Sequence, residues 1–235
     1  AGHLPLLREC ARDIDTPAGL QRIALAALVR LSAAVKEELQ PDDFAPLEAS
    51  LGDASWKVRM RGCEEIAALG GPAVVVLAGA LAERLRDDSA FVRGAACEAL
   101  GASPEAALAS SATLARCLLD GHELVRSCAC KALGGCPDAV AKHADEVAQL
   151  FGDESDLVRW SACKAFTAAK NAVKPHLPEI RDWLQGEPER CIRQALIELL
   201  EAVGEPEDAA LLRAAKQCLG SDTEGLVMLP GLQTS

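Results

Sequence analysis

The sequence predicts an all-α solenoid of about six two-helix repeats. A short motif recurs in register along the chain, which is typical of a repeat protein rather than of a single globular core. Within each copy the apolar residues follow the spacing of one helical face. Half of the residues are hydrophobic, only 3% are aromatic and none is Tyr, a composition that suits close helix packing better than a β-sandwich.

The recurring motif is an acidic residue, followed five positions later by Val or Ile and then by Arg. The anchor residues of its clear copies are Val58, Val92, Val125, Val158 and Ile192. They stand 34, 33, 33 and 34 residues apart, a step that holds one pair of short helices. A weaker first copy begins at Asp15, has Gln21 in place of Arg, and precedes the next copy by 38 residues.

Each anchor is expected to lie on the second helix of its repeat. In the copy around Val92, Ala96, Ala99 and Leu100 continue the same apolar stripe. Three serines stand three positions before an anchor, where a side chain can cap the first turn: Ser55, Ser89 and Ser155. Glycines are expected to end these helices: Gly70, Gly101, Gly134 and Gly204.

A proline follows each of these glycines and is expected to open the next helix: Pro72, Pro104, Pro137 and Pro206. The apolar segment that follows, for example residues 74–85, is long enough for the first helix of the next repeat. Two short amphipathic helices cannot bury both apolar faces alone, so successive pairs must stack. We therefore expect one solenoid domain over residues 1–220 and a loose tail over residues 221–235.

The Asp-x-x-x-x-Val-Arg frame, with Ala-Leu-Gly at residues 99–101 and 132–134, resembles the short HEAT repeat, especially the phycobilisome-lyase type. The resemblance implies a right-handed α-α superhelix, a HEAT/armadillo-like solenoid. It also implies a structural ladder between neighbouring repeats, made of Asp53, Arg59, Asp87, Arg93, Asp120, Arg126, Asp153, Arg159 and Arg193. We expect this ladder to weaken towards both ends, where Gln21 and Pro188 depart from the frame.

The chain is acidic, and its formal net charge of −11 disfavours a nucleic acid or an anionic membrane surface as partner. A protein partner with basic segments matches this charge better. No run of 18 apolar residues occurs, so we expect no membrane insertion. We expect an intracellular, cytoplasmic protein with reduced thiols, and an organelle stays open because a leader before Ala1 can have been removed.

Four cysteines recur five positions after an anchor, which invites a metal or redox interpretation: Cys63, Cys97, Cys130 and Cys163. Neighbouring repeats lie about 10 Å apart, whereas a zinc site needs each sulfur within about 2.3 Å of the metal. We expect half-buried packing residues instead. The single His-Glu pair, His122-Glu123, cannot build the di-iron centre of HEAT-fold hydroxylases, and no nucleophile has an evident base. We therefore expect no metal, no cofactor and no enzyme activity.

Two positions on each second helix, two and six residues after the anchor, point away from the apolar stripe, on the face that usually lines the concave side of HEAT solenoids. They supply the candidate partner-binding residues Met60, Glu64, Glu98, Lys131, Trp160, Lys164 and Glu198. Gly94, Ser127 and Gln194 share these positions. Because Trp is typical of interface anchors, Trp160 with Lys131 and Lys164 forms one candidate docking patch. The alternative is that Trp160 covers a neighbouring helix.

The sequence offers a long helical-repeat surface and no convergent reactive groups. We therefore predict a non-catalytic scaffold or adaptor that binds another protein along that surface. Two alternatives remain, a structural subunit of a large assembly and, from the repeat type alone, a subunit resembling the phycobilin lyases that attach a chromophore.

Overall fold

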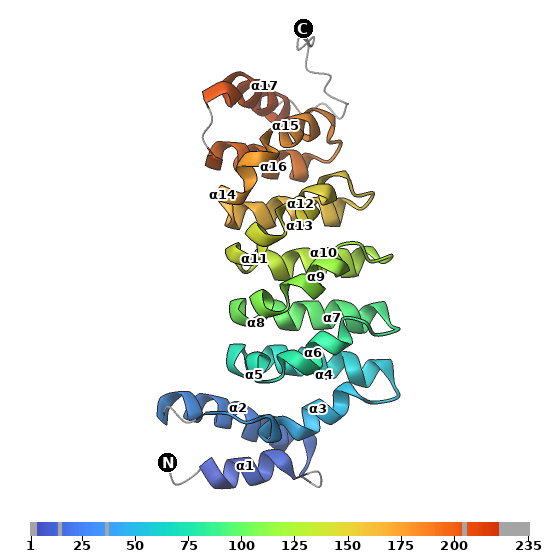
Figure 1. Cartoon of the computed structure of the whole chain (residues 1–235), viewed down its shortest axis with the longest axis vertical. Coiled ribbons are helices and arrows are strands. Elements are labelled where there is room, and N and C mark those ends of the chain that lie inside the picture. Colours follow the sequence, from blue (N-terminus) through green and yellow to red (C-terminus); the bar gives the residue numbers. More distant parts are fainter. Residues whose placement is uncertain (1–3, 14–15, 36–37, 204–205, 221–235) are drawn as a thin grey trace.

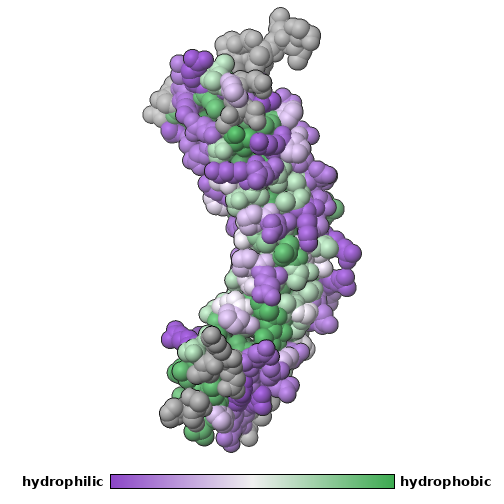
Figure 2. All heavy atoms as spheres, turned by 60° about the vertical axis from the view of Figure 1, so that its left-hand side comes forward, coloured by the Kyte–Doolittle hydropathy of each residue, from purple (hydrophilic) through white to green (hydrophobic). Residues whose placement is uncertain are grey.

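The computed structural model describes residues 4–13, 16–35, 38–203 and 206–220. Within them every regular element is a helix, and the helices stack into an elongated, curved molecule (Figure 1, Figure 2). The predicted all-α superhelical repeat fold is therefore confirmed. None of the described helices is both long and apolar enough to cross a lipid bilayer. Asp15, Gly204 and the predicted tail over residues 221–235 lie outside the described residues.

The second helices of the repeats form one layer of the stack. They are α2 (Ala18–Val35), α4 (Trp56–Leu69), α7 (Ala90–Gly101), α10 (Glu123–Gly134), α13 (Asp156–Ala168) and α16 (Arg190–Val203). From α4 onwards each of them packs directly on the next. The anchors Val92, Val125 and Val158 are fully buried between them, so the apolar stripe read from the sequence is the seam of the stack.

The first helices form the other layer, which covers one side of the second helices (Figure 1). They are α1 (Leu4–Arg12), η1 (Pro41–Phe44) with α3 (Ala45–Leu51), α5 (Gly71–Val76) with α6 (Ala78–Arg84), α8 (Pro104–Ala109) with α9 (Ser111–Cys117), α11 (Pro137–Lys142) with α12 (Ala144–Gln149) and η2 (Leu150–Gly152), α14 (Lys170–Val173) with η3 (Lys174–His176) and α15 (Leu177–Gly186), and η4 (Pro206–Asp208) with α17 (Ala209–Gly220).

The expectation of a single first helix over residues 74–85 is wrong in one respect. The segment is divided into α5 and α6, because Leu77 between them has φ −97° and ψ 11°, outside the helical region. The bend lets Val74, Leu77 and Leu81 all reach the core, where each is at most 2% exposed. Burial of apolar side chains from both halves thus replaces the continuity of one helix.

The three predicted capping serines stand at the N-cap positions, but their hydroxyls make no capping hydrogen bond. The acidic residue of the motif makes a different contact, to the backbone of the N-cap residue itself. The carboxylates of Asp53, Asp87 and Asp153 accept hydrogen bonds from the N-cap backbone N–H groups over 2.7, 3.0 and 2.9 Å. A charged acceptor two residues upstream therefore fixes the loop that enters each second helix.

The predicted glycine stops have two different physical reasons. Gly70 ends α4 with φ +93°, a backbone conformation that side chains rarely adopt. Gly101 is instead required by close packing, since a Cβ there would lie 2.8 Å from the Cα of Ala132. Gly134 is in the same situation, at 3.0 Å from the Cα of Ala165. These two glycines therefore set how closely consecutive second helices approach.

The regular stack breaks between the first two repeats. Val58 is 37% exposed, whereas the equivalent Val92, Val125 and Val158 are fully buried. The step from the first copy to the second is 38 residues rather than 33 or 34, so α2 does not cover α4 as each later second helix covers the next (Figure 1).

Candidate protein-binding surface

Arginine–carboxylate pairs join each repeat to the next. Arg93 on α7 donates from Nε and Nη2 to the Asp120 carboxylate over 2.7 and 2.8 Å. Its Nη1 donates to the backbone carbonyl of Asp87, in the loop before its own helix, over 2.8 Å. Four pairs of the recurring frame share the forked geometry: Arg59–Asp87, Arg93–Asp120, Arg126–Asp153 and Arg159–Glu187. Outside the frame, Arg181 on α15 donates to both carboxylate oxygens of Asp208 in η4. A planar fork on a carboxylate fixes the orientation of neighbouring repeats.

This ladder stops at both ends of the regular stack. Gln21 stands where the first Arg would be, and it donates to two backbone carbonyls near the end of α1 rather than to Asp53. At the other end, Arg193 donates to two carbonyls of the loop before α16 and, among the described residues, pairs with no carboxylate. The ladder therefore spans the repeats from α4 to α15.

Three ladder carboxylates, Asp87, Asp120 and Asp153, are held in the charged form although they are partly buried. Burial raises the pKa of Asp120, but the hydrogen bonds from Arg93 and from the His122 N–H outweigh this and hold the pKa below its usual value. The same balance lowers the pKa of the equivalent carboxylates, Asp87 and Asp153. These groups are engaged inside the stack, so they are not available to hold a ligand.

The repeated cysteines pack inside the solenoid. Cys63, Cys97, Cys130 and Cys163 are fully buried, rather than half-buried as the sequence suggested. Burial raises the pKa of Cys63 and of Cys163 to about 12 and also raises that of Cys130, so these thiols stay protonated and are poor nucleophiles or metal ligands. Across the described part of the chain, no three His, Cys, Asp or Glu side chains are grouped to hold a metal ion.

Five exposed charged side chains occupy one position, six residues after the anchor, in consecutive repeats. They are Glu64, Glu98, Lys131, Lys164 and Glu198, and we call them the second-helix ridge. The Lys164 ammonium lies 3.5 Å from the Glu198 carboxylate. Lys131 forms no ion pair with any residue that the structure describes. The ridge therefore presents one unpaired cation between two carboxylates and an internal ion pair.

The other expected surface position, two residues after the anchor, is not consistently exposed. Gly94 and Ser127 are buried, because Leu124 packs over Gly94 and the Ser127 hydroxyl lies 2.9 Å from that of Ser161 on the next helix. These two residues belong to the contacts between second helices. Gln194 is exposed and donates to Glu198 over 3.1 Å.

Trp160 and Met60 occupy the same position and are half-buried. The Trp160 ring packs against the hydrophobic core, and the Lys164 ammonium lies 5.7 Å from its centroid. Trp160 thus covers part of the stack and also leaves one edge beside the second-helix ridge. The packing agrees with the interpretation that Trp160 covers its neighbours, and its role in docking stays a prediction.

Sequence reasoning missed the apolar side chains at the N-terminal ends of the second helices. Trp56 and Phe91 are 38% and 51% exposed, and their rings stack at 5.3 Å between centroids and 22° between planes. The Phe91 ring also lies 6.3 Å from that of His122 in the next repeat. The sequence does indicate exposed apolar side chains at this position, since Phe91 and Leu157 directly precede an anchor yet fall outside the buried stripe.

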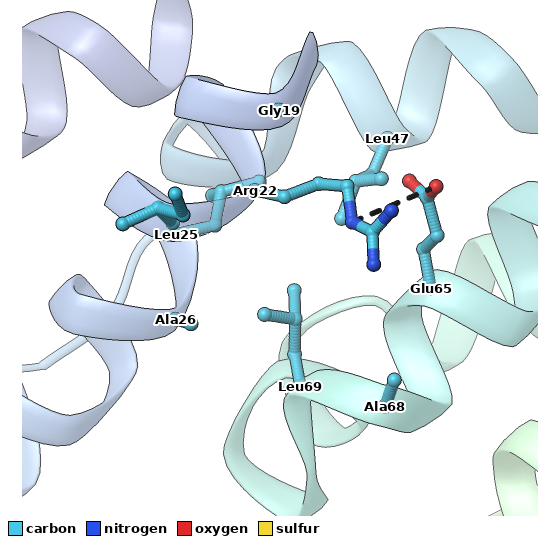
Figure 3. A pocket seen from close by; sticks show the side chains of 9 residues that line it. Gly19, Arg22, Leu25, Ala26, Leu47, Glu65, Ala68 and Leu69 are labelled. Carbon is cyan, nitrogen blue, oxygen red and sulfur yellow. Dashed lines mark ion pairs between the residues drawn. The ribbon is translucent and has the colours of Figure 1, made fainter.

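A groove of about 430 Å³ lies where the stack breaks, between α2 and α4. Leu25, Leu47 and Leu69 give it an apolar floor, and Arg22 reaches across its mouth toward Glu65, with 4.0 Å between Nε and Oε1 (Figure 3). Apart from this ion pair its lining is apolar or small. The described residues that line the groove include no arrangement of acid, base and nucleophile.

Comparison with solved structures shows the fold. An engineered protein is similar to this chain with a TM-score of 0.59 and 15% identity, over 84% of this chain and 96% of that one. Computationally designed armadillo repeat proteins for modular peptide recognition are similar with a TM-score of 0.55 and 19% identity, over 85% of this chain and 99% of that one. The complex of CpcE and CpcF of phycocyanin lyase from Nostoc has a TM-score of 0.48 and 20% identity, over 70% of this chain and 98% of that one.

No protein-family model matches the sequence, and no curated protein is significantly similar to it. The recurring frame, the stacked helix pairs and the solved structures together identify the fold as a HEAT-like or armadillo-like helical repeat.

Proposed function

We propose that this HEAT-like solenoid is a non-catalytic scaffold that binds another protein along the second-helix ridge. One observation carries the proposal: consecutive repeats each present an exposed charged residue at the same helical position, on one continuous stack of helices. A regular row of this kind suits an extended or helical segment of a partner, which can contact one repeat after another.

The groups that usually perform chemistry are occupied within the stack, which supports a binding role. The ladder carboxylates accept hydrogen bonds from arginines of the neighbouring repeat. The repeated thiols are fully buried, and burial raises the pKa values of Cys63, Cys130 and Cys163. The designed armadillo proteins of similar fold recognise peptides, and the same use of a helical-repeat surface fits this chain.

The sign of the charges along the second-helix ridge defines the partner chemistry. Read from α4 to α16 the ridge is acidic, acidic, basic, basic and acidic. Repeats lie about 10 Å apart, and an extended chain rises about 3.3 Å per residue. A complementary extended segment would therefore place a charged residue at about every third position, basic first and acidic in the middle.

Affinity capture with the chain and with a charge-reversed variant tests the proposal. The wild-type chain should capture certain proteins at a constant stoichiometry. We expect the Lys131→Glu, Lys164→Glu double variant not to capture them, because the middle of the ridge then repels the acidic part of the partner. Urea unfolding would show that the variant keeps its fold.

A matched control reverses two exposed lysines of the first-helix layer, with Lys142→Glu and Lys174→Glu. This variant has the same net charge as the ridge variant and should keep the captured proteins. If both variants lose them equally, net charge rather than the ridge controls binding. If neither loses them, the ridge is not the binding surface.

A further inference from the structure

The N-terminal half of the stack carries aromatic side chains that lie outside the hydrophobic core. Trp56 and Phe91 are absent from the hydrophobic core, and more than a third of each is exposed. Their rings stack on each other across two repeats, so they form one continuous apolar surface. Leaving such a surface in water costs free energy roughly in proportion to its area, and exposed apolar patches commonly mark interaction sites.

Carboxylates lie beside this aromatic pair along the second helices. Phe91 and Glu98 are seven residues apart on α7, which is close to two full turns, so they share one face about 10 Å apart. Glu64 holds the same ridge position on α4, the helix that begins with Trp56. Two acidic residues of the second-helix ridge thus flank the aromatic pair on the side of the helix C-termini.

Carboxylates also lie beyond the other ends of these helices. Asp88 is in the loop three residues before Phe91, and Glu123 follows His122, whose ring contacts Phe91. Both acids are exposed, and neither forms an ion pair with a residue in the described part of the chain. We call Trp56, Phe91, Glu64, Glu98, Asp88 and Glu123 the acidic–aromatic patch. Lys57, with its ammonium 5.8 Å from the Trp56 centroid, is a cation at its edge.

We propose that the acidic–aromatic patch docks a basic amphipathic segment of a partner protein, with apolar side chains against Trp56 and Phe91 and Lys or Arg side chains against the carboxylates. This inference rests on the proposed scaffold function and names the partner chemistry for the α4–α7 half of the same face. Charge complementarity selects the basic partner. An Arg of that segment gains twice, because its aliphatic part packs against the exposed part of the Phe91 ring and its guanidinium pairs with a neighbouring carboxylate.

The patch also sets the length of the segment. The aromatic pair and the flanking acids extend over α4, α7 and the start of α10, so the surface crosses two repeat boundaries. At about 10 Å per boundary, a partner helix rising 1.5 Å per residue needs roughly 14 residues to cover it. Apolar residues at helical spacing on one side of such a segment would face the rings.

Binding of labelled synthetic peptides to the full chain tests this inference by fluorescence anisotropy. The probe is an amphipathic helix of Leu and Arg, and the comparison peptides replace Arg by Glu or Leu by Ser. We expect the chain to bind the Leu–Arg peptide at least about tenfold more tightly than either comparison peptide, with affinity falling as salt is added. Failure to bind the Leu–Arg peptide, or equal binding of all three, overturns the proposal.

Variants locate the binding. One double variant is Trp56→Ser with Phe91→Ser, and the other is Glu64→Gln with Glu98→Gln. We expect each of them to bind the Leu–Arg peptide about tenfold more weakly than the wild-type chain does. Trp183→Ser is the matched aromatic control, since Trp183 is 40% exposed on α15. Glu105→Gln with Asp138→Asn is the charge control on α8 and α11. Circular dichroism and urea unfolding confirm that each variant is folded.

The result separates this inference from the scaffold function. If the patch variants bind the Leu–Arg peptide as the wild-type chain does, the patch is not its site and this inference fails. The scaffold function then still depends on the capture experiment with Lys131→Glu and Lys164→Glu, which leaves every patch residue in place. Loss of peptide binding in both patch variants, with both controls unchanged, supports the inference whatever the capture experiment shows.

Discussion

Arg126 and Asp153 are joined by two parallel hydrogen bonds, of 2.7 Å from Nε and 2.8 Å from Nη2, across the boundary between two repeats. Their side chains are only 10% and 9% exposed. Arg126 Nη1 also donates to the backbone carbonyl of Asp120 over 2.9 Å. One guanidinium therefore holds the loop before its own helix and the carboxylate of the next repeat.

We predict that Arg126→Leu lowers the free energy of unfolding by about 2 to 3 kcal/mol, because it leaves the Asp153 carboxylate without its guanidinium partner. Urea unfolding followed by circular dichroism measures the change. The control is Arg116→Leu, at an exposed arginine of α9, which should change stability by less than about 0.5 kcal/mol. Equal losses in the two variants would show that the ladder contributes no more than an ordinary surface arginine.

Acid should weaken the stack through the same carboxylates. The pKa values of Asp87, Asp120 and Asp153 are lower in the folded chain than the usual value of about 4. Their contribution is therefore fully present above about pH 4 and is lost as the pH falls through the folded values. We expect the free energy of unfolding to fall steeply below about pH 4.

The variant Asp120→Asn tests the sign of this dependence. It should be less stable than the wild-type chain at neutral pH, and it should lose less free energy of unfolding between neutral pH and about pH 3. Asp138→Asn, at an exposed carboxylate of α11, is the control and should keep the wild-type pH profile. A variant profile parallel to that of the wild-type chain would contradict the assignment to Asp120.

The sequence predicted the second helices well, because their signals are local. The anchor spacing, the apolar stripe through Val92, Ala96 and Leu100, and the Gly and Pro boundaries each depend on residues a few positions apart. The division of the first helix at Leu77 was not predictable in the same way. A continuous apolar segment is compatible with one straight helix as well as with two short ones. Which of the two forms depends on which side chains can be buried against the neighbouring repeat, and that is not visible in the local sequence.

The surface was harder to predict than the stack for a physical reason. Helical phase shows which side a residue occupies, but exposure also depends on the sizes of the neighbours. Gly94 and Trp160 share one position in the repeat, yet Gly94 lies under Leu124 while Trp160 keeps an exposed edge. The pairing of Trp56 with Phe91 joins different repeats, so no single helix pattern contained it.

The cysteines should divide into reactive and unreactive classes. Cys130 is fully buried and its pKa is raised by that burial, whereas Cys191 is exposed at the start of α16. Since the thiolate is the reacting species, we expect a thiol-alkylating reagent to modify Cys191 at least about a hundredfold faster than Cys130 in the folded chain. Peptide mass spectrometry at successive times gives both rates. Similar rates under native conditions would mean that the repeats open easily.

Substitution of glycine by alanine should change the free energy of unfolding in opposite directions at Gly101, where α7 approaches α10 closely, and at Gly79 in α6. A methyl group at Gly101 would lie 2.8 Å from the Cα of Ala132, so the helices must separate to accept it. We expect Gly101→Ala to lower the free energy of unfolding by about 1 to 3 kcal/mol. Gly79 lies within α6, and a Cβ there meets nothing within 4 Å. Gly79→Ala should therefore raise stability by about 0.5 to 1 kcal/mol, because Ala has the higher helix propensity.

Urea unfolding of the two single variants, compared with the wild-type chain, measures both effects on one scale. The pair is informative because the chemical change is the same and only the environment differs. Stabilisation by Gly101→Ala would show that the contact with Ala132 is loose enough to accept a methyl group. In that case helix propensity, rather than the spacing of neighbouring repeats, would decide which residue is best at the end of α7.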